Sequence, residues 1–102
     1  EAHRLGQAYG LTHYAAAKSA ALGLMRNLSR EVGHDGVTIN ALSLGAMDNF
    51  DDFTNIAAKV TAVGRAGSAA DVGAASLYLI SDEASWMTGQ TIIIDGGATV
   101  PV

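Results

Sequence analysis

The 102-residue sequence contains no cysteine, and its only proline is Pro101. Without cysteine, a disulfide framework and a thiolate metal site are both excluded. Six basic side chains are outnumbered by ten acidic ones, which gives a net charge of −4, so we expect neither nucleic acid nor an anionic membrane as a partner. No apolar run approaches the ~20 residues of a membrane span, and nothing resembles a signal peptide. We therefore expect a cytoplasmic protein.

Apolar residues are abundant, at 49% of the sequence. That content excludes a disordered tail, which would be richer in charge. The length supports at most one domain, and the 12 glycines mark the boundaries between periodic segments. Because the chain opens at Glu1 without a methionine, we expect residues 1–102 to be a single partial domain.

A long helix is predicted near the start of the chain. Apolar and long side chains recur at alternating spacings of four and three, which is one helix face: Tyr14, Lys18, Ala21, Met25, Leu28 and Val32. Thr12 is the expected N-cap, and Gly33 is expected to close the helix in a left-handed conformation. A second stripe of small residues (Ala16, Ala20 and Gly23) predicts that the helix packs on two sides.

Two short apolar runs, at 37–44 and 91–94, predict strands buried on both faces. Between them we expect a short helix within 46–64 and a second helix that Ser68 caps, with Asp71 as its capping-box partner. Strands joined by such a crossover should be parallel, with a right-handed connection. The predicted fold class is α/β. Since two strands leave open edges, we expect one end of a larger doubly wound sheet.

Tyr14 and Lys18 are the residues that can carry chemistry. At a separation of four they share a helix face. A free phenol has a pKa of about 10, and a nearby ammonium favours the phenolate, which makes a tyrosine a usable general acid or base. The same spacing also suits a core aromatic beside a lysine that extends its ammonium to water.

Further motifs follow this pair in a fixed order. They are Asn27-Leu28-Ser29-Arg30-Glu31, Gly36-Val37-Thr38-Ile39-Asn40-Ala41, Gly64-Arg65-Ala66-Gly67, Leu79-Ile80-Ser81-Asp82, Thr88-Gly89-Gln90 and Asp95-Gly96-Gly97. Together with Tyr14 and Lys18 they resemble the C-terminal half of the short-chain dehydrogenase/reductase family. The resemblance covers nearly the whole chain from Tyr14 to Gly97.

This resemblance implies a Rossmann-type sheet and hydride transfer between NAD or NADP and a small carbonyl or alcohol substrate. Tyr14 would be the general acid/base, and Lys18 would hold the nicotinamide ribose and tune the tyrosine. The cofactor-binding loop would contain Gly45, Met47 and Asn49. Residues 48–63 would form the substrate lid, which holds the phenylalanines expected to contact substrate: Phe50 and Phe53.

The chain also departs from the family pattern. The glycine-rich loop that cradles the cofactor phosphates would precede this segment, and the position of the family's catalytic serine, thirteen before Tyr14, is Glu1. Leu44-Gly45 stands for the usual Pro-Gly, and Asn49 for a threonine. The alternative function is a non-catalytic remnant that self-associates or docks. The expected protein partner is a second copy or a complementing N-terminal half.

No metal site is predicted. His3, His13 and His34 form no cluster in the sequence, and His13 beside Tyr14 is interpreted as a supporting or interface residue. The acidic group Asp48, Asp51 and Asp52 is typical of a solvated turn rather than a cation site. The substrate remains open, although the motifs are nearest to members of the family that act on 3-oxoacyl thioesters and on sugars or polyols.

Overall fold

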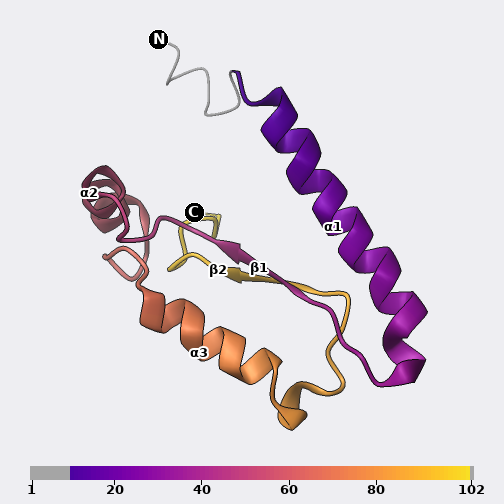
Figure 1. Ribbon diagram of the computed structural model, residues 1–102. Helices are drawn as coiled ribbons and strands as arrows, with labels where there is room; N and C mark the ends of the chain where they lie inside the picture. The colour runs from indigo at the N-terminus through magenta and orange to yellow at the C-terminus, as the bar shows by residue number, and fades with distance from the viewer. Residues whose placement is uncertain (1–9, 102) are drawn as a thin grey trace.

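The computed structural model describes residues 10–101, apart from the side chain of Phe53. Its elements follow the predicted order of helix, strand, helix, helix, strand. Their bounds are α1 Thr12–Val32, β1 Ala41–Leu44, α2 Asp51–Val60, α3 Ala69–Leu79 and β2 Thr91–Ile94, with 3-10 turns η1 at Gly33–Asp35 and η2 at Asp82–Ala84. Figure 1 shows the two strands at the centre, between α1 and α3.

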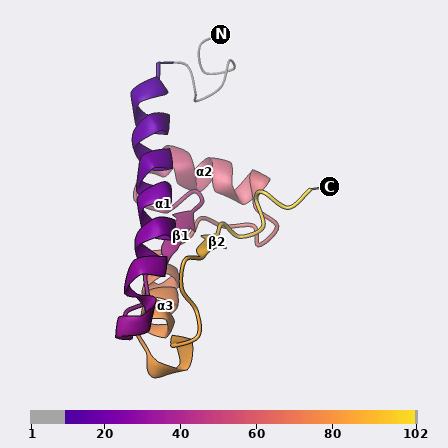
Figure 2. The same ribbon diagram turned by 90° about the vertical axis from the view of Figure 1, so that its right-hand side faces the viewer.

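The strands β1 and β2 are parallel, as predicted. Ala41 lies opposite Thr91, and the register continues to Leu44 opposite Ile94. Within the described residues the sheet has these two strands. Figures 1 and 2 together place α1 and α3 on opposite faces of this sheet. Helices on both faces of a parallel sheet are the arrangement of doubly wound α/β folds, so the predicted fold class is confirmed.

The first half of the predicted strand 37–44 is not a strand. The side chain of Asn40 donates from Nδ2 to the Met87 carbonyl oxygen at 3.1 Å and accepts at Oδ1 from the Gln90 N–H at 3.1 Å. These side-chain bonds hold residues 37–40 to the turn before β2. A regular ladder therefore begins only at Ala41, whose N–H donates to the Gln90 carbonyl oxygen at 2.9 Å.

Both predicted caps of α1 are wrong, although the bounds of the helix are confirmed. Thr12 is the first helical residue, and Leu11 occupies the N-cap position without a side-chain cap bond. Gly33 is right-handed, with φ −60°, because the chain continues into the 3-10 turn η1. The left-handed residue is Gly36, with φ +79°, whose N–H donates to the Gly33 carbonyl oxygen at 3.0 Å.

The core of the described residues is small. Its buried hydrophobic residues are Met25, Ala57, Ala66 and Ala84. No large side chain in this part of the chain is fully buried, and Trp86 is 99% exposed. Three of the four core residues are alanines, which remove little apolar area from water. Most of the apolar surface that the sequence supplies therefore stays open.

Two predictions of burial are consequently wrong. The strands are not covered on both faces, since Leu44 is 46% and Ile93 60% exposed. The small-residue stripe of α1, at Ala16, Ala20 and Gly23, is exposed, and the helix buries only Met25 and Ser29. A sheet of two strands is too narrow to cover a helix of 21 residues, so one face of α1 has nothing within residues 10–101 to pack against.

The two helices of the crossover agree with the sequence more closely. The helix predicted within 46–64 is α2, whose Ala57 is fully buried, while Ile56 and Val60 are about half exposed. The capping box before α3 is present. Ser68 donates from its backbone N–H and from Oγ to Asp71 Oδ2, at 2.8 and 3.0 Å. These bonds satisfy donors at the exposed start of α3.

Candidate active site

Tyr14 and Lys18 lie together on one face of α1. The Lys18 Nζ is 5.5 Å from the centre of the Tyr14 ring, which is within reach of a cation–π contact. Tyr14 is 54% exposed, so its ring is not buried among the described residues. The chemical role of the pair stays a prediction.

The pair borders a groove of about 520 Å³ between α1 and the sheet. This volume is within the usual range for small-molecule sites. The Thr91 Oγ1 in its wall is buried and has no hydrogen-bond partner among the described residues. Besides Tyr14 and Lys18, the lining residues are Ala21, Leu22, Ala41, Leu42, Ser43, Leu44 and Thr91. The sequence patterns did not indicate Leu22, Ser43 or Thr91. Ser43 and Thr91 reach the groove through the pairing of β1 with β2, and Leu22 through the position of α1 beside the sheet.

The predicted cofactor loop begins directly after Leu44, the last residue of β1 and of the groove lining. Gly45 directly follows β1, and its N–H donates to the Ile94 carbonyl oxygen at 2.9 Å. A Cβ on Gly45 would lie 2.8 Å from the Cα and the Cβ of Asp95. Only glycine permits the two backbone segments to approach this closely. Glycine is therefore required at position 45 by packing.

Met47 is held by a main-chain bridge to Gly67. The Gly67 N–H donates to the Ala46 carbonyl oxygen at 3.0 Å, and the Asp48 N–H donates to the Gly67 carbonyl oxygen at 2.8 Å. In such a parallel pairing the N–H and C=O of Met47 itself point away from Gly67. In residues 10–101 they have no hydrogen-bond partner, so they can bind a polar ligand.

The other predicted site residues lie beyond the groove. Asn49 and Phe50 are exposed residues that precede α2, and Phe50 is 60% exposed. Gly45, Met47, Asn49 and Phe50 do not line the groove of Tyr14 and Lys18. The backbone of Phe53 is in the first turn of α2, but its side chain is outside the described residues, as is the serine-equivalent position Glu1.

An ion pair next to this loop was not predicted. Arg65 donates from Nη1 and Nη2 to the two carboxylate oxygens of Asp71, at 2.8 and 3.2 Å. Hydrogen bonds from Arg65 and from Ser68 lower the pKa of Asp71 well below its usual range. The sequence indicated the capping role of Asp71 and the motif that contains Arg65, but the pairing of the two side chains depends on the path of the turn between them.

The lowered pKa of Asp71 predicts an acid-sensitive fold. Because the folded-state pKa is below the unfolded one, the charged pair contributes stability above about pH 4, and this contribution is lost as the pH falls below that value. We expect the urea midpoint of the wild-type chain to decrease from pH 5 to pH 3 and that of Asp71→Asn to decrease less. Asp82→Asn, which removes an exposed carboxylate, should retain the wild-type dependence. Equal slopes for both variants would contradict this assignment.

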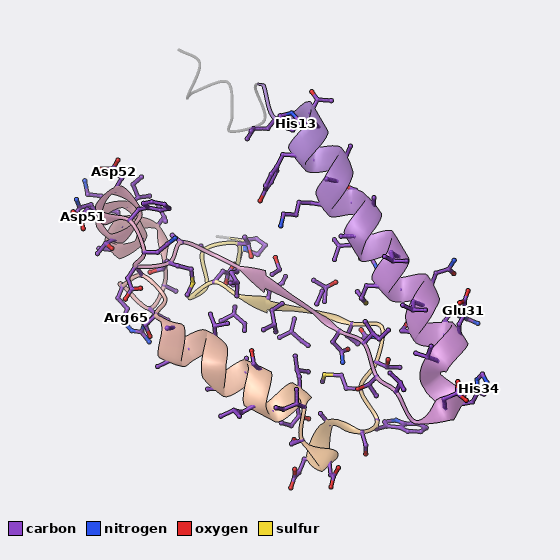
Figure 3. All side chains as sticks on the ribbon, viewed as in Figure 1. His13, Glu31, His34, Asp51, Asp52 and Arg65 are labelled. Carbon is purple, nitrogen blue, oxygen red and sulfur yellow. The ribbon has the colours of Figure 1, made fainter. Side chains whose placement is uncertain are left out.

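Figure 3 shows where the remaining titratable candidates lie. His13 is on the first turn of α1, whereas Glu31 and His34 are at its opposite end. Asp51 and Asp52 are on α2. In residues 10–101 no three histidine or acidic side chains come close enough to hold a metal ion. In the same range no helix is long and apolar enough to cross a bilayer.

Comparison with known proteins gives the family. Residues 1–99 match the family model described as enoyl-(acyl carrier protein) reductase. The chain belongs to the short-chain dehydrogenase/reductase family. Among curated members, the 3-oxoacyl-[acyl-carrier-protein] reductase FabG of Salmonella typhimurium is 38% identical over 95 residues. The short-chain reductase NovJ of Streptomyces niveus is 35% identical over 101 residues.

Solved structures of family members also match this chain. A 3-oxoacyl-[acyl-carrier protein] reductase with bound NAD from Brucella melitensis matches 88% of this chain and 34% of its own, with a TM-score of 0.78 and 34% identity. A 4-hydroxyisoleucine dehydrogenase complexed with NADH matches 87% of this chain and 40% of its own, with a TM-score of 0.75 and 27% identity. The two curated relatives each match 86% of this chain, which spans 38% of their own length.

Proposed function

We propose that this chain supplies the proton-transfer part of an oxidoreductase site, in which hydride passes between NAD or NADP and a carbonyl or alcohol. The observation that carries the proposal is the Lys18 ammonium 5.5 Å from the Tyr14 ring, in a groove that includes the carboxyl end of β1. In open α/β sheets, ligands bind beyond the carboxyl ends of the strands. The family membership and the nucleotide-bound structures of relatives support the same assignment.

The described residues fit a nicotinamide nucleotide. The Lys18 ammonium offers three donors in a groove large enough for part of such a ligand. Beyond Gly45, the unpaired N–H and C=O of Met47 suit a carboxamide, which needs one donor and one acceptor. Asn49 follows with a second amide side chain. When bound, the nicotinamide ring supplies or accepts the hydride.

In the proposed reduction, the Tyr14 hydroxyl donates its proton to the substrate oxygen as the carbonyl carbon accepts hydride. The carbonyl thus becomes an alcohol, and solvent returns a proton to the phenolate. The Lys18 ammonium beside the ring stabilises that phenolate by charge, and oxidation runs the same steps in reverse. Each proton transfer of this kind contributes roughly 10²–10⁴ to a rate.

We propose 3-oxoacyl thioesters as the substrate class, because the names of the Salmonella and Brucella relatives state that activity. Phe50, at the start of α2 and 60% exposed, would contact the acyl chain. An exposed aromatic side chain near the proposed cofactor loop suits the hydrocarbon end of such a substrate.

The test uses two preparations, because the chain spans less than half of its relatives. One is the 102-residue chain. The other is a chimera in which this chain replaces the matching segment of the Salmonella reductase. We expect the chimera to bind NADH or NADPH by fluorescence titration and to oxidise it with an acetoacetyl thioester.

Each possible result decides between the two functions. A chimera that binds nucleotide but never oxidises it would overturn the catalytic proposal. Light scattering of the 102-residue chain then tests the alternative, self-association. The open apolar surface, with Ile80 80% and Trp86 99% exposed, supports that alternative. A stable monomer would contradict it.

A further inference from the structure

The Arg65–Asp71 ion pair is adjacent to the loop that carries Met47. Asp71 accepts four hydrogen bonds, two from the Arg65 guanidinium and two from Ser68. Arg65 Nη1 also donates to the Ala66 carbonyl oxygen at 2.9 Å. The carboxylate of Asp71 therefore holds residues 65–68 against the first turn of α3. Figure 3 shows Arg65 at this junction between α2 and α3.

The segment held in this way is bonded in turn to residues 46–48. Gly67 lies between Ala66 and Ser68, and its N–H and C=O make the two main-chain bonds that bridge to Met47. The approach is close, because a Cβ on Gly67 would lie 2.8 Å from the Met47 Sδ. Asp71 and Met47 are thus joined by an unbroken series of hydrogen bonds and covalent links.

A second connection reaches α2. Thr61 Oγ1 donates to the Ala57 carbonyl oxygen at 2.7 Å, within the last turn of α2, and also lies 3.2 Å from the Arg65 carbonyl oxygen. Thr61 Oγ1 also accepts the Gly64 N–H at 2.9 Å. The backbone of Arg65 is therefore hydrogen-bonded to Thr61 of the proposed substrate lid, while its side chain is bonded to Asp71 of α3.

We propose that Asp71 is a positioning residue for cofactor binding: through Arg65 and Ser68 it fixes Gly67, which holds the Met47 backbone with its N–H and C=O toward the ligand. The inference rests on the proposed function. Asp71 itself touches no ligand, because its oxygens are used by Arg65 and Ser68. Its charge is required, since a neutral side chain cannot hold the guanidinium in the same two-bond arrangement.

The direct test is amide hydrogen exchange in the 102-residue chain. In Asp71→Asn we expect the Asp48 and Gly67 amides to exchange at least about tenfold faster, since local opening controls their protection. The Gly89 amide, which donates to the Ile39 carbonyl oxygen at 2.8 Å, should accelerate much less, because only the general loss of stability reaches it. Asp71→Glu, which retains both the charge and the capping box, should restore protection.

The control is Asp82→Asn, which makes the same chemical change at an exposed carboxylate in η2. Uniformly faster exchange at Asp48, Gly67 and Gly89 in Asp71→Asn would show a general loss of stability and would overturn the proposal. Unchanged exchange at Asp48 and Gly67 would overturn it as well.

A second readout separates this inference from the proposed function. In the chimera, Asp71→Asn should raise the Kd for NADH or NADPH about tenfold and change kcat less, as expected for a lost binding contact. If the unsubstituted chimera binds no nucleotide, the proposed function fails while the exchange result still decides the positioning role. If the chimera binds nucleotide and Asp71→Asn leaves the Kd unchanged, the positioning role fails alone.

Discussion

Replacing Tyr14 with phenylalanine should lower kcat for thioester reduction by the chimera roughly 10²–10⁴-fold, the usual contribution of a general acid. The ring and its contact with Lys18 would remain, because the substitution removes only the hydroxyl. We therefore expect the Kd for NADH or NADPH to change less than about threefold. Stopped-flow measurement of nucleotide oxidation, combined with a fluorescence titration, gives both quantities.

The matched control is Tyr78→Phe. Tyr78 is on α3 and is 48% exposed, close to the 54% of Tyr14, and it does not line the groove of Tyr14 and Lys18. The substitution Tyr78→Phe should leave kcat for thioester reduction unchanged. Equal losses in both variants, or full activity in Tyr14→Phe, would show that the Tyr14 hydroxyl is not the proton donor.

Replacing Gly45 with alanine should destabilise the chain by about 1–3 kcal/mol, the usual range for forced overpacking. The new Cβ would lie 2.8 Å from the Asp95 backbone, which cannot rotate away as a side chain could. Asp95 is itself held, since its carboxylate accepts the Gly97 N–H at 2.9 Å and both the N–H and the Oγ1 of Thr99. Urea unfolding followed by circular dichroism measures the loss.

Gly73→Ala is the control for this effect. Gly73 lies in the interior of α3, where an added Cβ would meet nothing within 4 Å. In a helix interior, alanine is more favourable than glycine by roughly 0.5–1 kcal/mol, so this variant should be more stable than wild type. A Gly45→Ala chain as stable as wild type would mean that β1 and Asp95 do not approach as closely as described.

The local elements were predictable because each depends on neighbours in the sequence. The periodicity of α1, the capping box of Ser68 and Asp71, and the β-branched run of β2 are all short-range signals. The family motifs added the Tyr14–Lys18 pair, and its spacing alone placed both residues on one face. The left-handed glycine was misplaced by three residues, because the turn η1 that precedes Gly36 has no pattern distinct from a helix end.

What could not be predicted depends on contacts between distant residues. The Asn40 side chain delays the start of β1 by binding the turn before β2, 47 and 50 positions away. Thr91 enters the groove wall only through the register with β1. Burial was overestimated for a different reason. An apolar run indicates a surface suited to burial, but the pattern does not show which other segment or protein buries it.

Hydride transfer at this site is tested most directly by following a deuterium label from the nucleotide to the product. The chimera would be mixed with an acetoacetyl thioester and NADH or NADPH carrying deuterium at the transferred position of the nicotinamide. We expect mass spectrometry to find the deuterium on the carbon of the new alcohol, and Tyr14→Phe to slow its appearance without changing its position. Nucleotide that binds yet retains its deuterium in the wild-type chimera would contradict hydride transfer at this site.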